Sequence, residues 1–204
     1  MISAATPCRL YLVLPAKVTT SFENVLAKVL AESEPACVLL PDDAGASGPA
    51  QDARLREMTV ARDVALLVEN DVERAVSIGA DGVHLPPDAA RLKEARARLG
   101  QRAIIGVGCI DSRHDAMVMA ELGADYVAFG ALPGDRQAEL IAWWSGIFVV
   151  ASVAFDIETE AAAERLARLG ADFVAPAASL WRSEDALERI GAIAAALRIG
   201  RSAA

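Results

Sequence analysis

Short, continuously apolar runs alternate with amphipathic stretches along the whole chain. Such runs are typical of strands buried on both faces, and apolar residues spaced three or four positions apart are typical of helices. The expected strands are Arg9–Leu14, Ala36–Leu40, Val64–Val68, Gly82–Leu85, Ala103–Val107, Tyr126–Phe129, Ile147–Ala151 and Phe173–Ala175. The expected helices are Ser21–Glu32, Gln51–Arg62, Asp71–Ile78, Asp88–Leu99, Ser112–Leu122, Asp135–Trp144, Ile157–Leu169 and Ser183–Leu197.

Strict alternation of strand and helix, eight times over, predicts a single-domain (β/α)8 TIM barrel across residues 1–204. The tripeptide Gly-Ala-Asp supports this prediction, because each copy ends a helical stretch and leads into an apolar run. The copies begin at Gly79, Gly123 and Gly170, which are 44 and 47 positions apart (123 − 79 and 170 − 123). Each interval has room for two strand–helix units, and each glycine can end a helix in the left-handed conformation.

The amino-acid composition limits the size of the core, the kinds of binding partner and the cellular compartment that are expected. With 204 residues the chain is shorter than the roughly 250 of a typical barrel, but its 54% apolar content is enough for a sizeable core. The net charge of −8 argues against nucleic acid or an anionic membrane as partner, since both select clustered Lys and Arg. Cys8, Cys37 and Cys109 are too scattered for a disulfide framework or a zinc site, which favours a reducing cytoplasm. Neither a signal peptide nor a membrane span is expected.

In a barrel of this type the chemistry lies at the carboxyl ends of the strands. Acidic and amide side chains are frequent at those positions and could together hold a divalent cation through oxygen. They are Asp42, Asp43, Asn70, Asp71, Asp88 and Asp111. Helix N-capping explains acids at the same positions without a metal, so both interpretations stay open.

Three segments carry a resemblance to a known family. Gly79–Leu85, Ile104–Val107, and Gly123–Val127 with Gly130 are similar, in this order, to the thiamine phosphate synthase family and its relative, the thiazole tautomerase. The resemblance implies a barrel enzyme that joins a pyrimidine methyl diphosphate to a thiazole phosphate, expels pyrophosphate and uses Mg²⁺. It also implies a small phosphorylated heterocycle as ligand and, because family members commonly associate through barrel helices, a homodimer.

The resemblance also implies site residues. If synthase activity is retained, Asn70, Asp71 and Asp88 form the metal side, although an ungapped count back from Gly79 moves the family's Asn-Asp pair onto Glu69-Asn70. No residue is singled out as catalytic. The expected substrate- and phosphate-binding residues are His84, Gly106, Gly108, Cys109, Gly130, Arg136, Ser152 and Ser179.

Several positions depart from the family pattern. Leu40-Pro41-Asp42-Asp43 is acidic where the family places cations for the diphosphate, and such repulsion is costly in a partly buried site. Pro86-Pro87 replaces Gly-Gln, and the loop after the sixth strand is abbreviated and offers only Arg136 as a cation. Ser152–Asp156 stands where the family has a Gly-Gly pair, so side chains would crowd a phosphate site made of bare backbone.

Several functional hypotheses remain open. The first is a diverged thiamine phosphate synthase with much of its anion site altered. The second is a catalytically degenerate paralogue that binds a small molecule or another protein. A thiazole tautomerase-like isomerase needs a similar phosphate site, whereas an unrelated barrel enzyme with a neutral or cationic substrate would suit the acidic positions. His84 and Cys109 also have ordinary packing interpretations.

Overall fold

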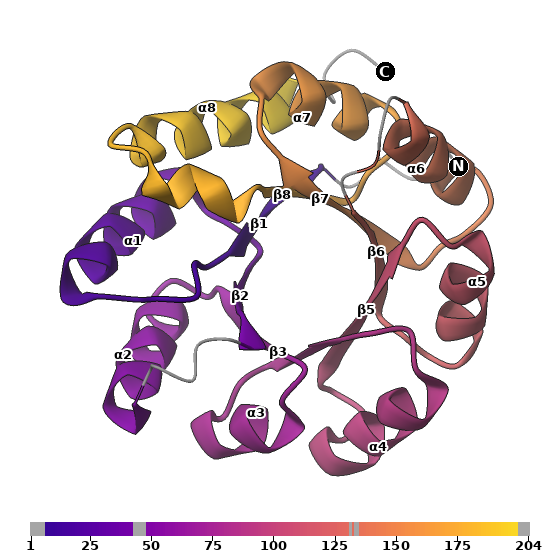
Figure 1. Ribbon diagram of the computed structural model, residues 1–204, viewed down its shortest axis with the longest axis horizontal. Coiled ribbons are helices and arrows are strands. Elements are labelled where there is room, and N and C mark those ends of the chain that lie inside the picture. The colour runs from indigo at the N-terminus through magenta and orange to yellow at the C-terminus, as the bar shows by residue number, and fades with distance from the viewer. Residues whose placement is uncertain (1–6, 43–47, 131, 133–134, 200–204) are drawn as a thin grey trace.

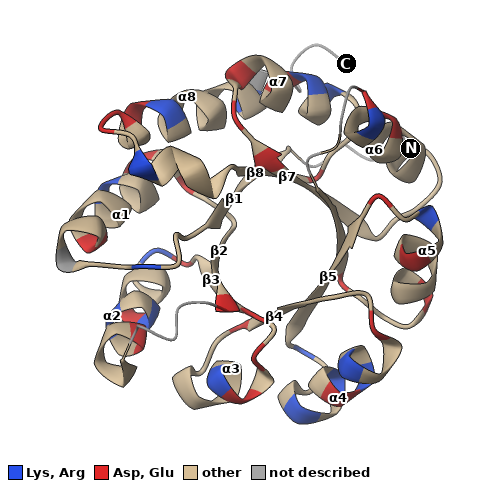
Figure 2. Cartoon of the chain, viewed as in Figure 1, with Lys and Arg blue, Asp and Glu red and all other residues tan. Residues whose placement is uncertain are grey.

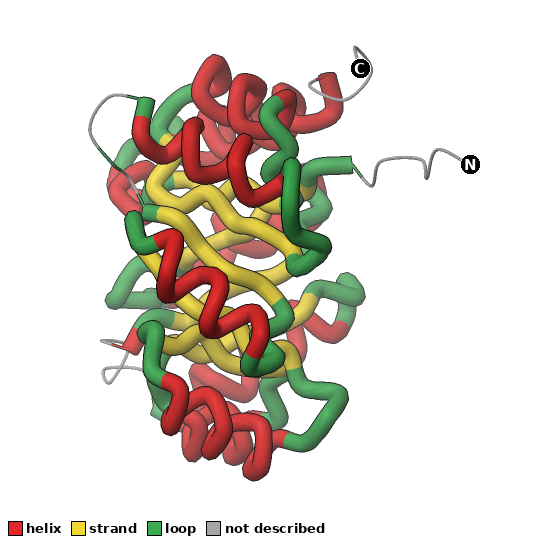
Figure 3. Tube along the Cα trace, turned by 90° about the vertical axis from the view of Figure 1, so that its right-hand side faces the viewer, coloured by secondary structure: helices red, strands yellow, loops and turns green. Residues whose placement is uncertain are grey.

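Eight parallel strands form a closed barrel in chain order, so the predicted (β/α)8 fold is confirmed. The computed structural model describes residues 7–42, 48–130, 132 and 135–199. Helices surround the barrel on the outside, as Figure 1 shows along the barrel axis and Figure 3 from the side. The strands are β1 (Arg9–Val13), β2 (Cys37–Leu40), β3 (Ala65–Glu69), β4 (Gly82–Leu85), β5 (Ile104–Ile110), β6 (Tyr126–Phe129), β7 (Ala151–Ile157) and β8 (Phe173–Pro176).

One α-helix follows each strand, and a 3-10 helix precedes the last α-helix. Among the residues that the structure describes, no helix is long and apolar enough to cross a membrane. The helices are α1 (Thr20–Ser33), α2 (Pro49–Val60), α3 (Val72–Ile78), α4 (Ala89–Leu99), α5 (Arg113–Glu121), α6 (Arg136–Ser145), α7 (Glu160–Arg168), η2 (Ala178–Arg182) and α8 (Ala186–Ile199).

Alternate residues of each strand face either the barrel interior or the helices, as the pleat of a strand requires. In β1, Leu10 and Leu12 pack in the large core beneath the helices, whereas Tyr11 faces inward. The buried residues of the interior cluster are Tyr11, Cys37, Leu39, Leu67, Tyr126, Ala128, Val153 and Ala175. The interior is therefore filled by side chains along most of its length.

The aspartates of the Gly-Ala-Asp repeats link neighbouring strands by hydrogen bonds. Each aspartate stands before an even-numbered strand and accepts a backbone N–H hydrogen bond from the strand before it. The pairs are Asp81 with Leu66 at 2.7 Å, Asp125 with Ile105 at 2.7 Å and Asp172 with Ser152 at 2.8 Å. Each copy of the repeat thus links an odd-numbered strand to the following even-numbered strand at the amino-terminal end of the barrel.

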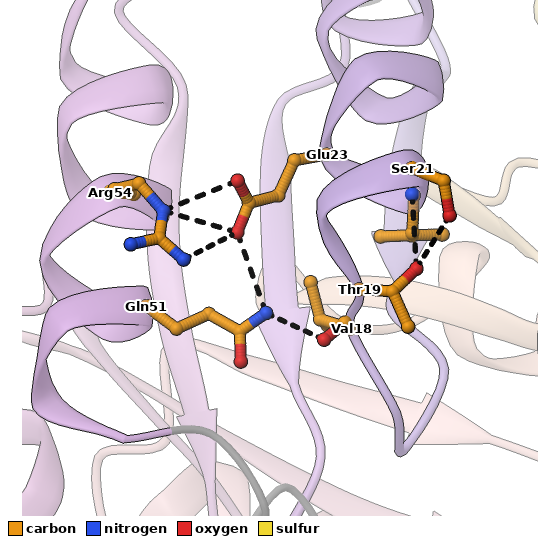
Figure 4. Close-up of polar contacts among 7 residues, drawn as sticks. Val18, Thr19, Ser21, Glu23, Gln51 and Arg54 are labelled. Atoms are coloured by element: carbon orange, nitrogen blue, oxygen red, sulfur yellow. Dashed lines mark hydrogen bonds and ion pairs between the residues drawn. The ribbon is translucent and has the colours of Figure 1, made fainter.

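Polar contacts also join the helices of the outer ring. Between α1 and α2, Gln51 Nε2 donates to the carbonyl of Val18 at 2.6 Å, and Arg54 forms an ion pair with Glu23 at 3.1 Å (Figure 4). Thr19 caps α1, because its hydroxyl accepts the N–H of Phe22 at 3.2 Å. These contacts set the spacing of the first two helices around β2.

The seventh strand is displaced from its predicted position. The prediction of a strand at Ile147–Ala151 is wrong, because β7 begins at Ala151. Ile147 and Val149 are exposed, at 65% and 103%. Phe148 instead stacks on the fully buried Trp144, with ring centroids 4.1 Å apart. The apolar run therefore serves the packing of the connection against α6.

Candidate functional site

The carboxyl ends of the strands open on the face turned toward the viewer in Figure 1, and this opening is called the mouth below. Acidic positions lie along the inner ring of the barrel near β3 and β4 and again near β7 and β8, as Figure 2 shows. Glu69 ends β3, and one of its carboxylate oxygens accepts the backbone N–H of Asp42 at 3.2 Å. Asp43 lies outside the described residues.

A buried chain of hydrogen bonds crosses the barrel beneath the mouth. The hydroxyls of Tyr11 and Tyr126 lie 2.8 Å apart, and the Tyr126 hydroxyl lies 2.9 Å from Nδ1 of His84. The three side chains come from β1, β6 and β4, and none is more than 6% exposed. Gly106 makes this arrangement possible, because a Cβ there would lie 1.8 Å from Cζ of Tyr126.

Burial keeps the imidazole of His84 uncharged. Removal from water lowers the pKa of His84 to about 4, because the cationic form is the more costly one to desolvate. Burial likewise raises the pKa of Tyr11 and of Tyr126 well above its usual range, so both remain phenols. Phe155 contacts His84 edge-on at a centroid distance of 5.2 Å. The site therefore presents neutral hydrogen-bonding groups between aromatic walls.

The three predicted metal-side residues lie at the ends of β3 and β4. Asp71 caps α3 by accepting the N–H of Arg74 at 2.8 Å, and Asp88 caps α4 by accepting the N–H of Ala90 at 2.8 Å. Asn70 has a left-handed backbone, with φ of 58°. Across the described part of the chain, no group of three or more His, Cys, Asp or Glu side chains is arranged to hold a metal. Helix capping is thus the role that the structure gives both aspartates.

Two arginines reach the same side of the mouth, and sequence reasoning missed them. Arg91 Nη2 donates to the carbonyl of Asn70 at 3.2 Å, and Arg74 pairs with Asp52 at 2.7 Å. The hydrogen bond to Asp52 is the first cause of the raised pKa of Arg74, and this ion pair already gives the cation a carboxylate partner. A signal was available, because Asp-x-x-Arg occurs at both helix starts, where the aspartate caps and the arginine follows within the first turn.

The predicted phosphate-side residues are dispersed. Gly130 directly follows β6, Arg136 is half-exposed at the start of α6 and pairs with Glu139 at 3.6 Å, and Ser179 is exposed on η2. At the end of β7, Asp156 is exposed and left-handed, with φ of 61°.

Two further predicted positions need correction. Cys109 does not face the mouth: it packs in the core beneath the helices at 2% exposure, and burial raises the pKa of its thiol to about 12. Ser152 does not lie at the mouth either, because β7 begins only one residue before it. It is fully buried at the amino-terminal end of the strand, where its hydroxyl contacts Asp172 at 3.3 Å.

Gln137 is a third residue that the sequence analysis did not select, and here the sequence carries no signal for it. Its side-chain amide donates to the carbonyls of Phe129 and Phe155, both at 2.9 Å. These carbonyls lie at the carboxyl ends of β6 and β7, where the short connection to α6 begins. Gln137 therefore fixes the two strand ends from which this side of the mouth is built.

Comparisons with known proteins agree with the fold and with the sequence motifs. A family model described as thiamine monophosphate synthase matches residues 10–180. The thiamine-phosphate synthase of Rhodospirillum centenum is 39% identical over 190 residues, which are 86% of this chain and 90% of that protein. The corresponding protein of Erythrobacter litoralis is 36% identical over 199 residues, covering 91% and 93%.

A solved structure gives the same result for the fold. A thiamine phosphate pyrophosphorylase from Pyrococcus furiosus superposes with a TM-score of 0.78 over 96% of this chain and 98% of that chain, at 20% identity. The family match and the identities to the two relatives confirm the resemblance seen in the sequence. The chain belongs to the thiamine monophosphate synthase family.

Proposed function

We propose that the protein is a thiamine phosphate synthase-like transferase, which joins a pyrimidine methyl diphosphate to a thiazole phosphate and releases pyrophosphate. The observation that carries this proposal is the 39% identity, over 86% of the chain, to a protein named thiamine-phosphate synthase. The family match begins at residue 10 in β1 and ends at residue 180 in η2, so it takes in all eight strand ends that border the mouth.

Mg²⁺ belongs to this proposal, and the donor chemistry near β3 and β4 fits it. Asn70, Asp71 and Asp88 offer the hard oxygen atoms that this ion prefers. Each aspartate uses Oδ1 for capping, and its Oδ2 makes no hydrogen bond to any residue that the structure describes. A bound Mg²⁺ would neutralise charge on the departing diphosphate.

The diphosphate also needs cations from the protein. We infer that Arg91 and Arg136 supply them, because Arg74 is already paired with Asp52 at 2.7 Å. Within the described part of the chain Arg91 has no carboxylate within ion-pair distance, and its guanidinium lies against the end of β3. Among the residues that the structure describes, the ion pair of Arg136 is a long contact of 3.6 Å with Glu139, which leaves Arg136 available to an anion.

The coupling reaction itself tests the proposal. Purified protein is incubated with both phosphorylated heterocycles and Mg²⁺, and thiamine phosphate and pyrophosphate are quantified. We expect the two products in equal amounts, their loss on addition of EDTA, and a lower rate in Asp88→Ala. Asp63→Asn serves as the matched control, because Asp63 is an exposed carboxylate before β3, at the opposite end of the barrel. Unchanged substrates, under conditions where the Rhodospirillum centenum relative turns over, would favour the degenerate-paralogue hypothesis.

A homodimer and a cytoplasmic location stay predictions. The net charge of −8 and the free, buried thiols of Cys37 and Cys109 support the second of them. Light scattering on the purified full chain tests the first: a dimer mass is expected, and a monomer mass at micromolar concentration would contradict it.

A further inference from the structure

The buried chain of Tyr11, Tyr126 and His84 determines which nitrogen of the imidazole carries the proton. Two hydroxyl protons and one imidazole proton must be distributed along contacts of 2.8 and 2.9 Å. If the imidazole proton were on Nδ1, Tyr126 would accept it and donate to Tyr11, whose own proton would then have no acceptor among the described residues. If Nδ1 is bare, Tyr11 donates to Tyr126 and Tyr126 donates to Nδ1. The second arrangement satisfies both buried hydroxyls and so places the imidazole proton on Nε2.

The Nε2 atom faces Gly108, an inward position of β5 that has no side chain. A Cβ built at Gly108 would lie 3.0 Å from Nε2 and 3.6 Å from Cε1 of His84. Gly108 is only half-buried and follows Gly106 by two residues toward the mouth. Within the described ranges Nε2 has no hydrogen-bond partner, although His84 as a whole is only 6% exposed. A donor fixed by its neighbours therefore points toward the mouth without an acceptor.

The walls around the imidazole hold it in one orientation. The ring of Tyr126 lies nearly parallel to it, at a centroid distance of 5.7 Å and an angle of 17°, and Phe155 meets it edge-on. Phe155 also packs edge-on against Tyr11, at 5.3 Å. A flat, apolar ligand edge could lie against these rings while one of its atoms accepts from Nε2. A phosphate would gain little there, because the donor is neutral and the walls are apolar.

We propose that His84 Nε2–H donates a hydrogen bond to a neutral acceptor on the heterocyclic part of the substrate. Tyr126 and Tyr11 are positioning residues, because they hold the imidazole in this tautomer. Gly108 provides the space for the contact. The proposal rests on the proposed function, because it takes the heterocycle in the mouth to be the substrate. It assigns His84 to recognition of the ring, whereas the diphosphate is bound elsewhere on the rim.

The tautomer can be measured without any turnover. The chain contains two histidines, His84 and His114, so long-range nitrogen–proton NMR spectra of the full protein will show two imidazoles. We expect a bare Nδ1 and a protonated Nε2 for His84 at neutral pH, and a shift of its Nε2 signal when hydroxymethylpyrimidine without diphosphate is added. An Nδ1–H tautomer, an imidazolium, or a signal that the pyrimidine leaves unchanged would overturn the proposal.

Kinetics of variants separate loss of the contact beside Gly108 from a general loss of structure. Gly108→Ala should raise KM for the pyrimidine substrate by about tenfold, the value of one hydrogen bond, and leave kcat within about twofold. The matched control is Gly146→Ala at the end of α6, where, among the described residues, the new Cβ would meet the carbonyls of Ala142 and Trp143 at 3.4 and 3.8 Å. Equal KM values for the two variants would count against the assignment. Absence of turnover in the wild type would remove the proposed function, whereas the NMR shift with the pyrimidine alone would still test the inference.

Discussion

Replacing Asp125, the aspartate of the second Gly-Ala-Asp copy, should lower the free energy of unfolding measurably, although its side chain is 47% exposed. In Asp125→Ala the backbone N–H of Ile105 loses its carboxylate acceptor at 2.7 Å, a charge-assisted bond worth about 1.5–3 kcal/mol. The ion pair with Arg96 at 2.8 Å adds about 0–1 kcal/mol, because it is partly exposed and Arg96 keeps its bond to the Ala103 carbonyl. The expected loss in free energy of unfolding is therefore about 1.5–4 kcal/mol.

For a chain of this length, such a loss lowers Tm by about 3–16 °C. Thermal and urea unfolding, followed by circular dichroism, measure it. Asp125→Asn retains an oxygen acceptor without the charge and should lose about 1 kcal/mol. The control is Glu164→Ala, which removes an exposed ion pair with Arg168 within one helix and should cost under about 0.5 kcal/mol. If Asp125→Ala proves as stable as Glu164→Ala, the claim that the aspartate of the repeat stabilises the barrel by linking two strands is refuted.

Other predictions follow from the barrel interior and the strand ends. Gly106→Ala forces a Cβ to within 1.8 Å of Tyr126 and should destabilise the protein by about 1–3 kcal/mol or more in urea unfolding; an unchanged midpoint would contradict this packing. Folding lowers the pKa of His84 from 6.5 to about 4, so the unfolded state binds more protons than the folded state between pH 6.5 and pH 4. The free energy of unfolding should therefore fall by about 3 kcal/mol as the pH decreases from 6.5 to 4. This decrease should be smaller in His84→Gln, and an equal decrease would contradict it. Ile110 is left-handed with φ of 52° and 61% exposed, so Ile110→Asn should gain about 1 kcal/mol in the same assay, and a loss would argue against strain there.

The fold was predictable because local pattern and global topology agree in this chain. Continuous apolar runs, capping aspartates and helix-ending glycines each recur at the interval of a strand–helix unit. The exception is instructive: the run at Ile147–Ala151 is as apolar as a strand, but Phe148 finds a stacking partner in Trp144. Which partner a side chain finds is a tertiary property, and a one-dimensional pattern does not contain it.

The site was less predictable, because side-chain direction depends on strand register. The predicted strand ended at Ala151, whereas β7 begins there, so Ser152 lies at the amino-terminal end of the barrel and not at the mouth. Cys109 was expected just beyond the fifth strand, but β5 extends to Ile110, and Cys109 faces the helices because neighbours in a strand alternate. His84 was selected for its motif, whereas its partners, Tyr11 and Tyr126, are 73 and 42 positions away (84 − 11 and 126 − 84). Only the closed barrel brings them together.

A crystal structure of the full chain with the pyrimidine diphosphate and Mg²⁺ tests the central claim most directly, namely that this barrel binds the synthase substrates at its carboxyl-terminal mouth. We predict the pyrimidine ring between Phe155 and Tyr126 within hydrogen-bonding distance of His84 Nε2, with the diphosphate toward Asn70, Asp88 and Arg91. A ligand bound at the amino-terminal face, or a mouth that stays empty at saturating ligand concentration, would contradict the account.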